Sequence, residues 1–271
     1  PGKSNRSFLH EDERSEPGYY RVLLHDDGTL VELTSSERTG MIRFTFPANI
    51  KPEIFVGDIG EIEVVSKRVI RGPGFNTTII FNKDIIEKEK NEGGYIFTFL
   101  SVKKGENVLI LKLGASTIDY ASTGMNLEAE ADTWDFDKFK EINREKWNNA
   151  LSVIEIDDTS KVNKTIFYTA VYHSLLIPWY ISDIQGNYKG ADGLVHKTKG
   201  QNEYGVFSPW DTFRSLHPLL CLIAPDRQND MILSMLDSYD QTGRLPKGPM
   251  TGNHIIPIIV DSYMKGIRGF D

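Results

Sequence analysis

The chain has 271 residues, 39% of them hydrophobic and 25% charged, which predicts a globular protein with a sizeable core and excludes a disordered or fibrous one. Its formal net charge is -7, without a Lys/Arg cluster, so nucleic acid and anionic membrane surfaces are not expected partners. No apolar run approaches the roughly 20 residues of a membrane span. The one cysteine, Cys221, excludes an intrachain disulfide.

The first half of the chain has the pattern of short antiparallel strands. Tyr19–Leu24 and Thr29–Leu33 flank Asp26-Asp27-Gly28, a hairpin turn in which glycine supplies the positive φ. Met41–Phe46 alternates apolar and polar residues, which predicts one buried face. The other predicted strands are Glu53–Val56, Gly60–Ile70, Asn76–Phe81, Gly94–Ser101 and Val108–Leu113. Many short strands with close turns favour an antiparallel β-sandwich, which we place at residues 1–125.

The second half has helical periodicity. Ala115–Ala131 lacks alternation and is interpreted as a connection, so residues 126–160 are expected to hold a linker and the helix Asp135–Leu151. A polar loop, Ile181–Glu203, interrupts the helices that follow. These further helices are predicted at Lys161–Leu176, Thr212–Ile223, Asp226–Tyr239 and Ile255–Lys265. Their lengths favour paired helices of an α/α solenoid or toroid over residues 161–271.

The stretch Val206–Arg214 gathers an aromatic ring, a carboxylate and a guanidinium in one turn. Trp210 offers a flat face for a pyranose ring, and Asp211 and Arg214 can hydrogen-bond vicinal hydroxyls. A purely structural alternative stays open at this point. In it, Asp211 caps a helix, Trp210 lies in the core, and Arg214 pairs with Asp211 at i+3.

A series of motifs, in order along nearly the whole chain, resembles glycoside hydrolase family 92, the calcium-dependent exo-acting α-mannosidases. Each motif is weak alone, and the ordered series is specific. The motifs are Phe8–Glu13, Pro17–Tyr20, Val31–Thr34, Glu37-Arg38, Phe167–Ala170, Tyr172–Ser174, Ser182–Gly186 with Tyr188 and Gly190, Phe207–Arg214, His217–Leu219, Gly243–Pro246, Gly252–His254 and Lys265-Gly266.

The resemblance implies an N-terminal β-sandwich, a helical linker and an (α/α)6 barrel, of which this chain is expected to be a fragment. The chain is expected to begin inside the sandwich and to end inside the barrel. Trp210, Asp211 and Arg214 would line the subsite for the terminal mannose, with Asn253 and His254 near the scissile bond. The general base would lie beyond residue 271, and calcium would draw on ligands largely outside this chain, so no metal ligand is assigned. The family also implies a bacterial periplasmic, cell-surface or secreted location.

The expected general acid is missing from the motif. Family members carry a Glu shortly before the segment that corresponds to Gly252–His254, whereas Leu245–Thr251 contains none. Either a remodelled loop supplies the proton, or the substrate is a mannose-1-phosphate diester, whose leaving group needs no protonation and whose phosphate Lys247 could contact. A non-catalytic carbohydrate-binding fragment and a sugar phosphorylase are the remaining alternatives.

Overall fold

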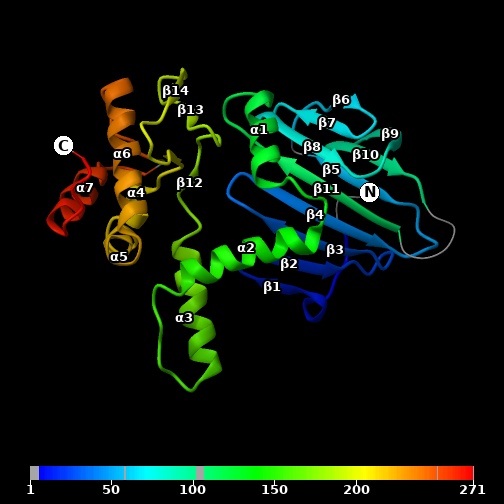
Figure 1. Ribbon diagram of the computed structural model, residues 1–271, viewed down its shortest axis with the longest axis horizontal. Coiled ribbons are helices and arrows are strands. Elements are labelled where there is room, and N and C mark those ends of the chain that lie inside the picture. Colours follow the sequence, from blue (N-terminus) through cyan, green and yellow to red (C-terminus); the bar gives the residue numbers. More distant parts are fainter. Residues whose placement is uncertain (1–5, 58, 102–106, 249, 271) are drawn as a thin grey trace. The chain divides into compact units, whose positions relative to one another are not determined.

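The computed structural model describes residues 6–57, 59–101, 107–248 and 250–270, which form two compact units, Pro1–Trp147 and Asn148–Asp271. The first unit is built on two antiparallel sheets (Figure 1). The larger sheet has the order β1-β2-β3-β4-β11-β8-β7-β6, with β1 (Arg14–Glu16), β2 (Tyr19–Leu23), β3 (Leu30–Ser35), β4 (Thr39–Phe46), β6 (Glu63–Ser66), β7 (Val69–Gly72), β8 (Thr77–Phe81) and β11 (Asn107–Gly114). The smaller has the order β5-β10-β9, with β5 (Glu53–Gly57), β9 (Ile85–Asn91) and β10 (Gly94–Phe99).

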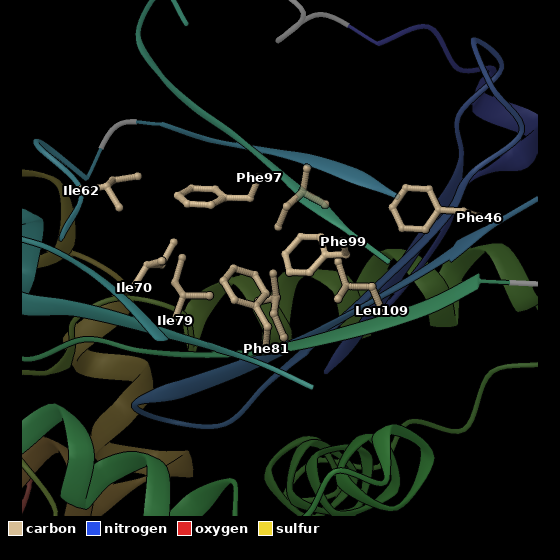
Figure 2. Packing of buried hydrophobic residues seen from close by; sticks show 10 residues of the cluster. Phe46, Ile62, Ile70, Ile79, Phe81, Phe97, Phe99 and Leu109 are labelled. Carbon is tan, nitrogen blue, oxygen red and sulfur yellow. The ribbon is translucent and has the colours of Figure 1, made fainter. Parts of the chain in front are cut away.

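Aromatic and aliphatic side chains from both sheets form the core of this unit (Figure 2). Phe81, from the larger sheet, lies with its ring centroid 4.9 Å from that of Phe99 and 6.3 Å from that of Phe97, both on the smaller sheet. All three side chains are almost fully buried. Because the two inner faces pack on one another, the unit is a β-sandwich, as the sequence predicts.

The outer face of the larger sheet is covered by a helix. Met41, on β4, packs against Phe136 and Phe139 of α2 (Phe136–Leu151). Beside this contact, Arg43 Nε donates to Glu32 at 2.6 Å and Arg43 Nη1 donates to Asp137 at 2.7 Å. The alternation in Met41–Phe46 therefore separates two covered faces, one turned to the sandwich core and one to α2.

Three local features of the first unit differ from the sequence predictions. The range Gly60–Ile70 does not form one strand. It contains β6 and the start of β7, and these two strands form a hairpin that ends at Gly72. Strand β9 was missed because its side chains are mostly exposed and charged. Helix α1 (Tyr120–Glu130) occupies the expected connection Ala115–Ala131. Its buried residues are mostly polar (Ser122, Thr123, Asn126 and Leu127), so no apolar periodicity marks it.

The second unit consists of helices and a loop region with short strand pairs. The helices are α3 (Lys161–Ser174), α4 (Pro209–Thr212), α5 (Leu216–Ile223), α6 (Pro225–Thr242) and α7 (Ile255–Met264). In the loop region β12 (Trp179–Tyr180) pairs with β15 (Tyr204–Gly205), and β13 (Asn187–Lys189) pairs with β14 (Val195–Lys197). The single helix predicted at Thr212–Ile223 is in fact divided between α4 and α5. No helix among the described residues is both long and apolar enough to cross a membrane.

The helices α5, α6 and α7 pack on one another. Cys221, Ile232 and Ile267 form one buried cluster between them. A second cluster has Met235, Ile255 and Ile258 at its centre, with Phe207, Phe213, Leu245 and Ile259 packed around it. The second cluster lies under the stretch that the sequence marks for sugar binding. The order of strands followed by helices confirms the predicted fold class, whereas the domain limits at residues 125 and 160 stay predictions.

Candidate functional site

The structure contradicts the purely structural interpretation of Val206–Arg214. Ser208, not Asp211, is the N-cap residue of α4, and its hydroxyl donates to the Asp211 carboxylate. Trp210 is 45% exposed and is therefore not a core residue. The Arg214 guanidinium lies 5.1 Å from the centroid of the Phe213 ring. The Trp210 indole and the Asp211 carboxylate are both exposed.

The backbone that leads into this turn is strained. Val206 has a φ of 63°, in the left-handed region that a β-branched side chain rarely adopts. It is 56% exposed, so packing of its own side chain does not account for the conformation. Strain of this kind is often found where a segment is held in place for function.

His254 brings the start of α7 to the same place. Its ring centroid lies 4.7 Å from that of Phe213, at an interplanar angle of 34°. Gly252, with a φ of 96°, leaves room for the His254 ring, because a Cβ there would lie 2.5 Å from His254 Cε1. Asn253 is exposed beside it. The structure therefore gathers Arg214, Phe213 and His254 from two segments about 40 positions apart in the sequence.

The loop without a glutamate lies against α4. A Cβ added at Gly248, where φ is 67°, would lie 3.0 Å from the Phe207 carbonyl oxygen and 3.2 Å from Pro209 Cδ. Lys247 is exposed. Residue 249 lies outside the described residues. The predicted acid loop and the predicted sugar-facing turn are thus neighbours.

Sequence reasoning missed one titratable group of this unit. Glu203, immediately before β15, is 3% exposed, and burial, aided by the charge of Asp237, raises the pKa of its carboxyl to about 8. No sequence motif marks it, because a lone Glu at the end of a polar loop has the pattern of a solvated residue.

Two further observations concern metals and cavities. Among residues 6–57, 59–101, 107–248 and 250–270, no group of three or more His, Cys, Asp or Glu side chains could hold a metal ion. In the sandwich, a cavity of about 200 Å³ has a floor that includes Phe44, Phe46 and Ile54, with Asp27 and Glu53 among its polar lining.

A β-sandwich is followed by packed helices, with the exposed side chains of Trp210, Asp211 and Arg214 and the half-buried His254 at two helix ends. This combination points to a protein of the carbohydrate-active class. Family models refine this assignment. The glycosyl hydrolase family 92 N-terminal domain matches residues 2–101, and the glycosyl hydrolase family 92 catalytic domain matches residues 123–271. The chain belongs to glycosyl hydrolase family 92.

Solved structures agree with this assignment. The family GH92 α-mannosidase BT3965 from Bacteroides thetaiotaomicron matches 98% of this chain with a TM-score of 0.87 and 25% identity, and it has also been solved in complex with mannoimidazole. The inverting mannosidase BT2199 from the same species has the same fold, with a TM-score of 0.87, 98% coverage of this chain and 24% identity. This chain spans 42% of the length of the first structure and 41% of that of the second. No curated protein matches the sequence significantly.

Proposed function

We propose that the protein hydrolyses terminal α-mannosides as an exo-acting, inverting glycosidase, and that this chain supplies the sandwich and the sugar-facing helix ends. The observation that carries the proposal is the exposed Trp210, Asp211 and Arg214 in and just after α4, with the half-buried His254 that precedes α7 lying against Phe213, in a chain of glycosyl hydrolase family 92. The mannosidases with solved structures support the choice of sugar.

Each of these residues has a role that its surroundings permit. The Trp210 indole stacks on the C–H face of the mannose ring. Asp211 accepts hydrogen bonds from two ring hydroxyls, while the Ser208 hydroxyl, which already donates to this carboxylate, fixes its orientation. Arg214 donates to a hydroxyl from its place above Phe213. Asn253 and His254 lie on the side of the bound mannose that carries the scissile bond.

The general acid and the general base that cleave the glycosidic bond are distinct from the sugar-binding residues. Inversion needs one carboxylic acid and one carboxylate about 6.5–9.5 Å apart, with a water molecule between the carboxylate and the anomeric carbon. No Glu or Asp occurs in 245–251, the loop beside α4. The exposed Asp211 serves in binding. Chain beyond residue 271 would supply the base, as the family resemblance implies.

A mannose-1-phosphate diester is the second candidate substrate. The specific observation in its favour is the exposed Lys247 in an acid-free loop that lies against α4. A phosphate leaves as a stable anion, so an enzyme without a general acid would cleave it while leaving unactivated mannosides intact. Equal rates on aryl and unactivated mannosides would contradict this candidate.

A non-catalytic carbohydrate-binding role is the alternative for this chain taken alone. The sandwich cavity favours it, because Phe44 and Phe46 offer apolar faces and Asp27 and Glu53 offer acceptors. In that case mannose would bind the chain without being released from a glycoside, and Phe44→Ala would weaken binding while Trp210→Ala would not.

The decisive test uses mannoimidazole as the ligand. We expect it to bind the chain, as measured by calorimetry, and we expect Trp210→Ala and Asp211→Asn to abolish binding. Trp179→Ala is the matched control, because Trp179 lies in the same unit and is 47% exposed, against 45% for Trp210. Loss of binding in all three variants, or in none, would contradict the assigned subsite.

Hydrolysis and its stereochemistry are measured on the intact polypeptide. Proton NMR of the first mannose released should show the β-anomer if the reaction inverts. Calcium dependence, tested by chelation and re-addition, and location outside the cytoplasm stay predictions from the family.

A further inference from the structure

Glu203 is a buried acid whose backbone is fixed on both sides. Its amide donates to Ser182 Oγ at 3.4 Å, and its carbonyl oxygen accepts from the Ile181 amide at 2.9 Å. The next residue, Tyr204, donates its amide to Ser234 Oγ of α6 at 3.0 Å. The carboxyl has a hydrogen bond with Ser234, but its Oε2 atom is buried without a hydrogen-bond partner.

The charged groups that act most on this carboxyl are two other carboxylates, both on α6. Asp237 accepts hydrogen bonds from the Tyr188 hydroxyl and from Gln241 Nε2. Asp230 Oδ2 accepts from the backbone amide and from Nδ2 of Asn202, both at 3.1 Å. Each aspartate thus accepts two hydrogen bonds, and a negative charge on Glu203 beside them would be opposed by both.

The cation on the same helix, Arg227, has other partners, although its Nε atom is buried without one. Arg227 donates to the Pro178 carbonyl oxygen at 2.9 Å, and its guanidinium lies 5.5 Å from the centroid of the Tyr204 ring. A buried acid that forms no ion pair is kept neutral by a proton, since burying an isolated charge costs far more. The raised pKa of this carboxyl, about 8, agrees.

We propose that Glu203 is a positioning residue that acts as a neutral carboxylic acid, keeping β15 against α6 and thereby holding the Val206–Arg214 turn in its sugar-binding place. Only two residues separate Glu203 from Val206, the strained residue that opens the turn. Loss of the proton places three carboxylates together and pushes β15 away from α6. The link to the sugar rests on the proposed function, whereas the neutral acid does not.

The first test observes the proton directly. In the chain labelled with ¹³C at the glutamate carboxyls, infrared or NMR spectra at pH 7 should show one protonated Glu that titrates near pH 8. This signal should be absent from Glu203→Gln and unchanged in Glu155→Gln, the matched control at an exposed position of the same unit. Ionisation of all glutamates at pH 7 would overturn the proposal.

The second test uses stability. Since the folded state holds the proton up to a higher pH than the unfolded chain does, stability must fall as the pH rises from about 4.5 to about 8 and then level off. The Tm of the wild type should drop over this range, relative to that of Glu203→Gln. Equal pH slopes would contradict the neutral acid. A calcium-induced rise in Tm that is absent from Glu203→Gln would show that a metal ion, not a proton, neutralises the Glu203 carboxylate. That result would overturn the proposal.

The third test links Glu203 to binding. Mannoimidazole affinity should fall above pH 8 in the wild type and stay level in Glu203→Gln. If the protonated Glu is observed but neither protein binds mannoimidazole at any pH, the proposed function fails and the neutral acid stands. If both bind with the same pH profile, the positioning role is overturned.

Discussion

The imidazole of His254 lies against the ring of Phe213, with 4.7 Å between centroids. One residue begins α7 and the other follows α4, so this single contact joins the two segments in which the sequence places its sugar-binding residues. Phe213 also lies beside the Arg214 guanidinium and packs on the Met235–Ile255–Ile258 cluster. Phe213 therefore supports both Arg214 and His254, which lie far apart in the sequence.

Phe213→Ala should therefore affect both stability and binding. A fully buried Phe→Ala change costs 3–5 kcal/mol, so for this half-buried ring we expect about 2 kcal/mol, measured by urea unfolding. Mannoimidazole affinity should fall about tenfold, roughly 1.4 kcal/mol, because Arg214 and His254 lose their common surface. Phe270→Ala is the control, since that half-buried ring packs in the other cluster of the same unit. It should lower stability and leave affinity unchanged; a loss of affinity in both variants would refute the role of Phe213.

Val206→Gly should stabilise the second unit. Relief of a left-handed β-branched residue is worth about 1–2 kcal/mol, and the added freedom of glycine in the unfolded chain offsets about 0.5–1 kcal/mol of that. A net gain of up to about 1.5 kcal/mol should appear in urea unfolding. The control is Val195→Gly, because Val195 is 60% exposed and lies in strand β14, where glycine should destabilise. Destabilisation by both changes would show that Val206 is not strained.

The sandwich could be predicted because alternating apolar and polar residues indicate which face of a strand is buried. Ile42 and Phe44 pack against the core that includes Phe46, as the period-two pattern indicates. The pattern could not show that α2 covers the opposite face, where the Arg43 charge is paired rather than solvated. Strand β9 and helix α1 were missed for a related reason, because charged exposed strands and helices with polar buried faces carry no apolar period.

The candidate site was predictable in part. Trp210, Asp211 and Arg214 lie close in sequence, and their proximity needs only local geometry. The approach of His254 to Phe213 depends on Phe213 and the first turns of α7 packing in the same cluster, which no local pattern specifies. Glu203 could not be predicted, because its burial depends on the packing of α6. In the sequence, Asp230 and Asp237 of this helix have the pattern of ordinary exposed acids.

Phe81→Ala should be among the most damaging changes in the sandwich. The ring is completely buried between Phe97 and Phe99 of the opposite sheet, so its removal opens a cavity at the centre of the core (Figure 2). We expect a loss of 3–5 kcal/mol, about the typical range for such a truncation, measured by chemical denaturation. Phe75→Ala is the control, since that ring is 72% exposed, and it should change stability by less than about 0.5 kcal/mol. Similar losses in the two variants would mean that Phe81 is not the centre of the core.

The ion pair between Arg43 and Asp137 should make the attachment of α2 to the sheet dependent on acid pH. Hydrogen bonds from Arg43, and then from Lys140, lower the pKa of Asp137 from 3.8 to about 2. Because the folded-state pKa is lower than the unfolded one, the stabilisation is present above pH 3.8 and disappears as the pH falls toward 2. The Asp137 side chain is 59% exposed, so its contribution should stay below about 1 kcal/mol. The stability difference between wild type and Asp137→Asn, measured by urea unfolding, should therefore shrink from neutral pH to pH 2, whereas Glu145→Gln at an exposed position of α2 should show no such trend. A difference that stays constant across this range would show that the carboxylate does not stabilise the fold through its charge.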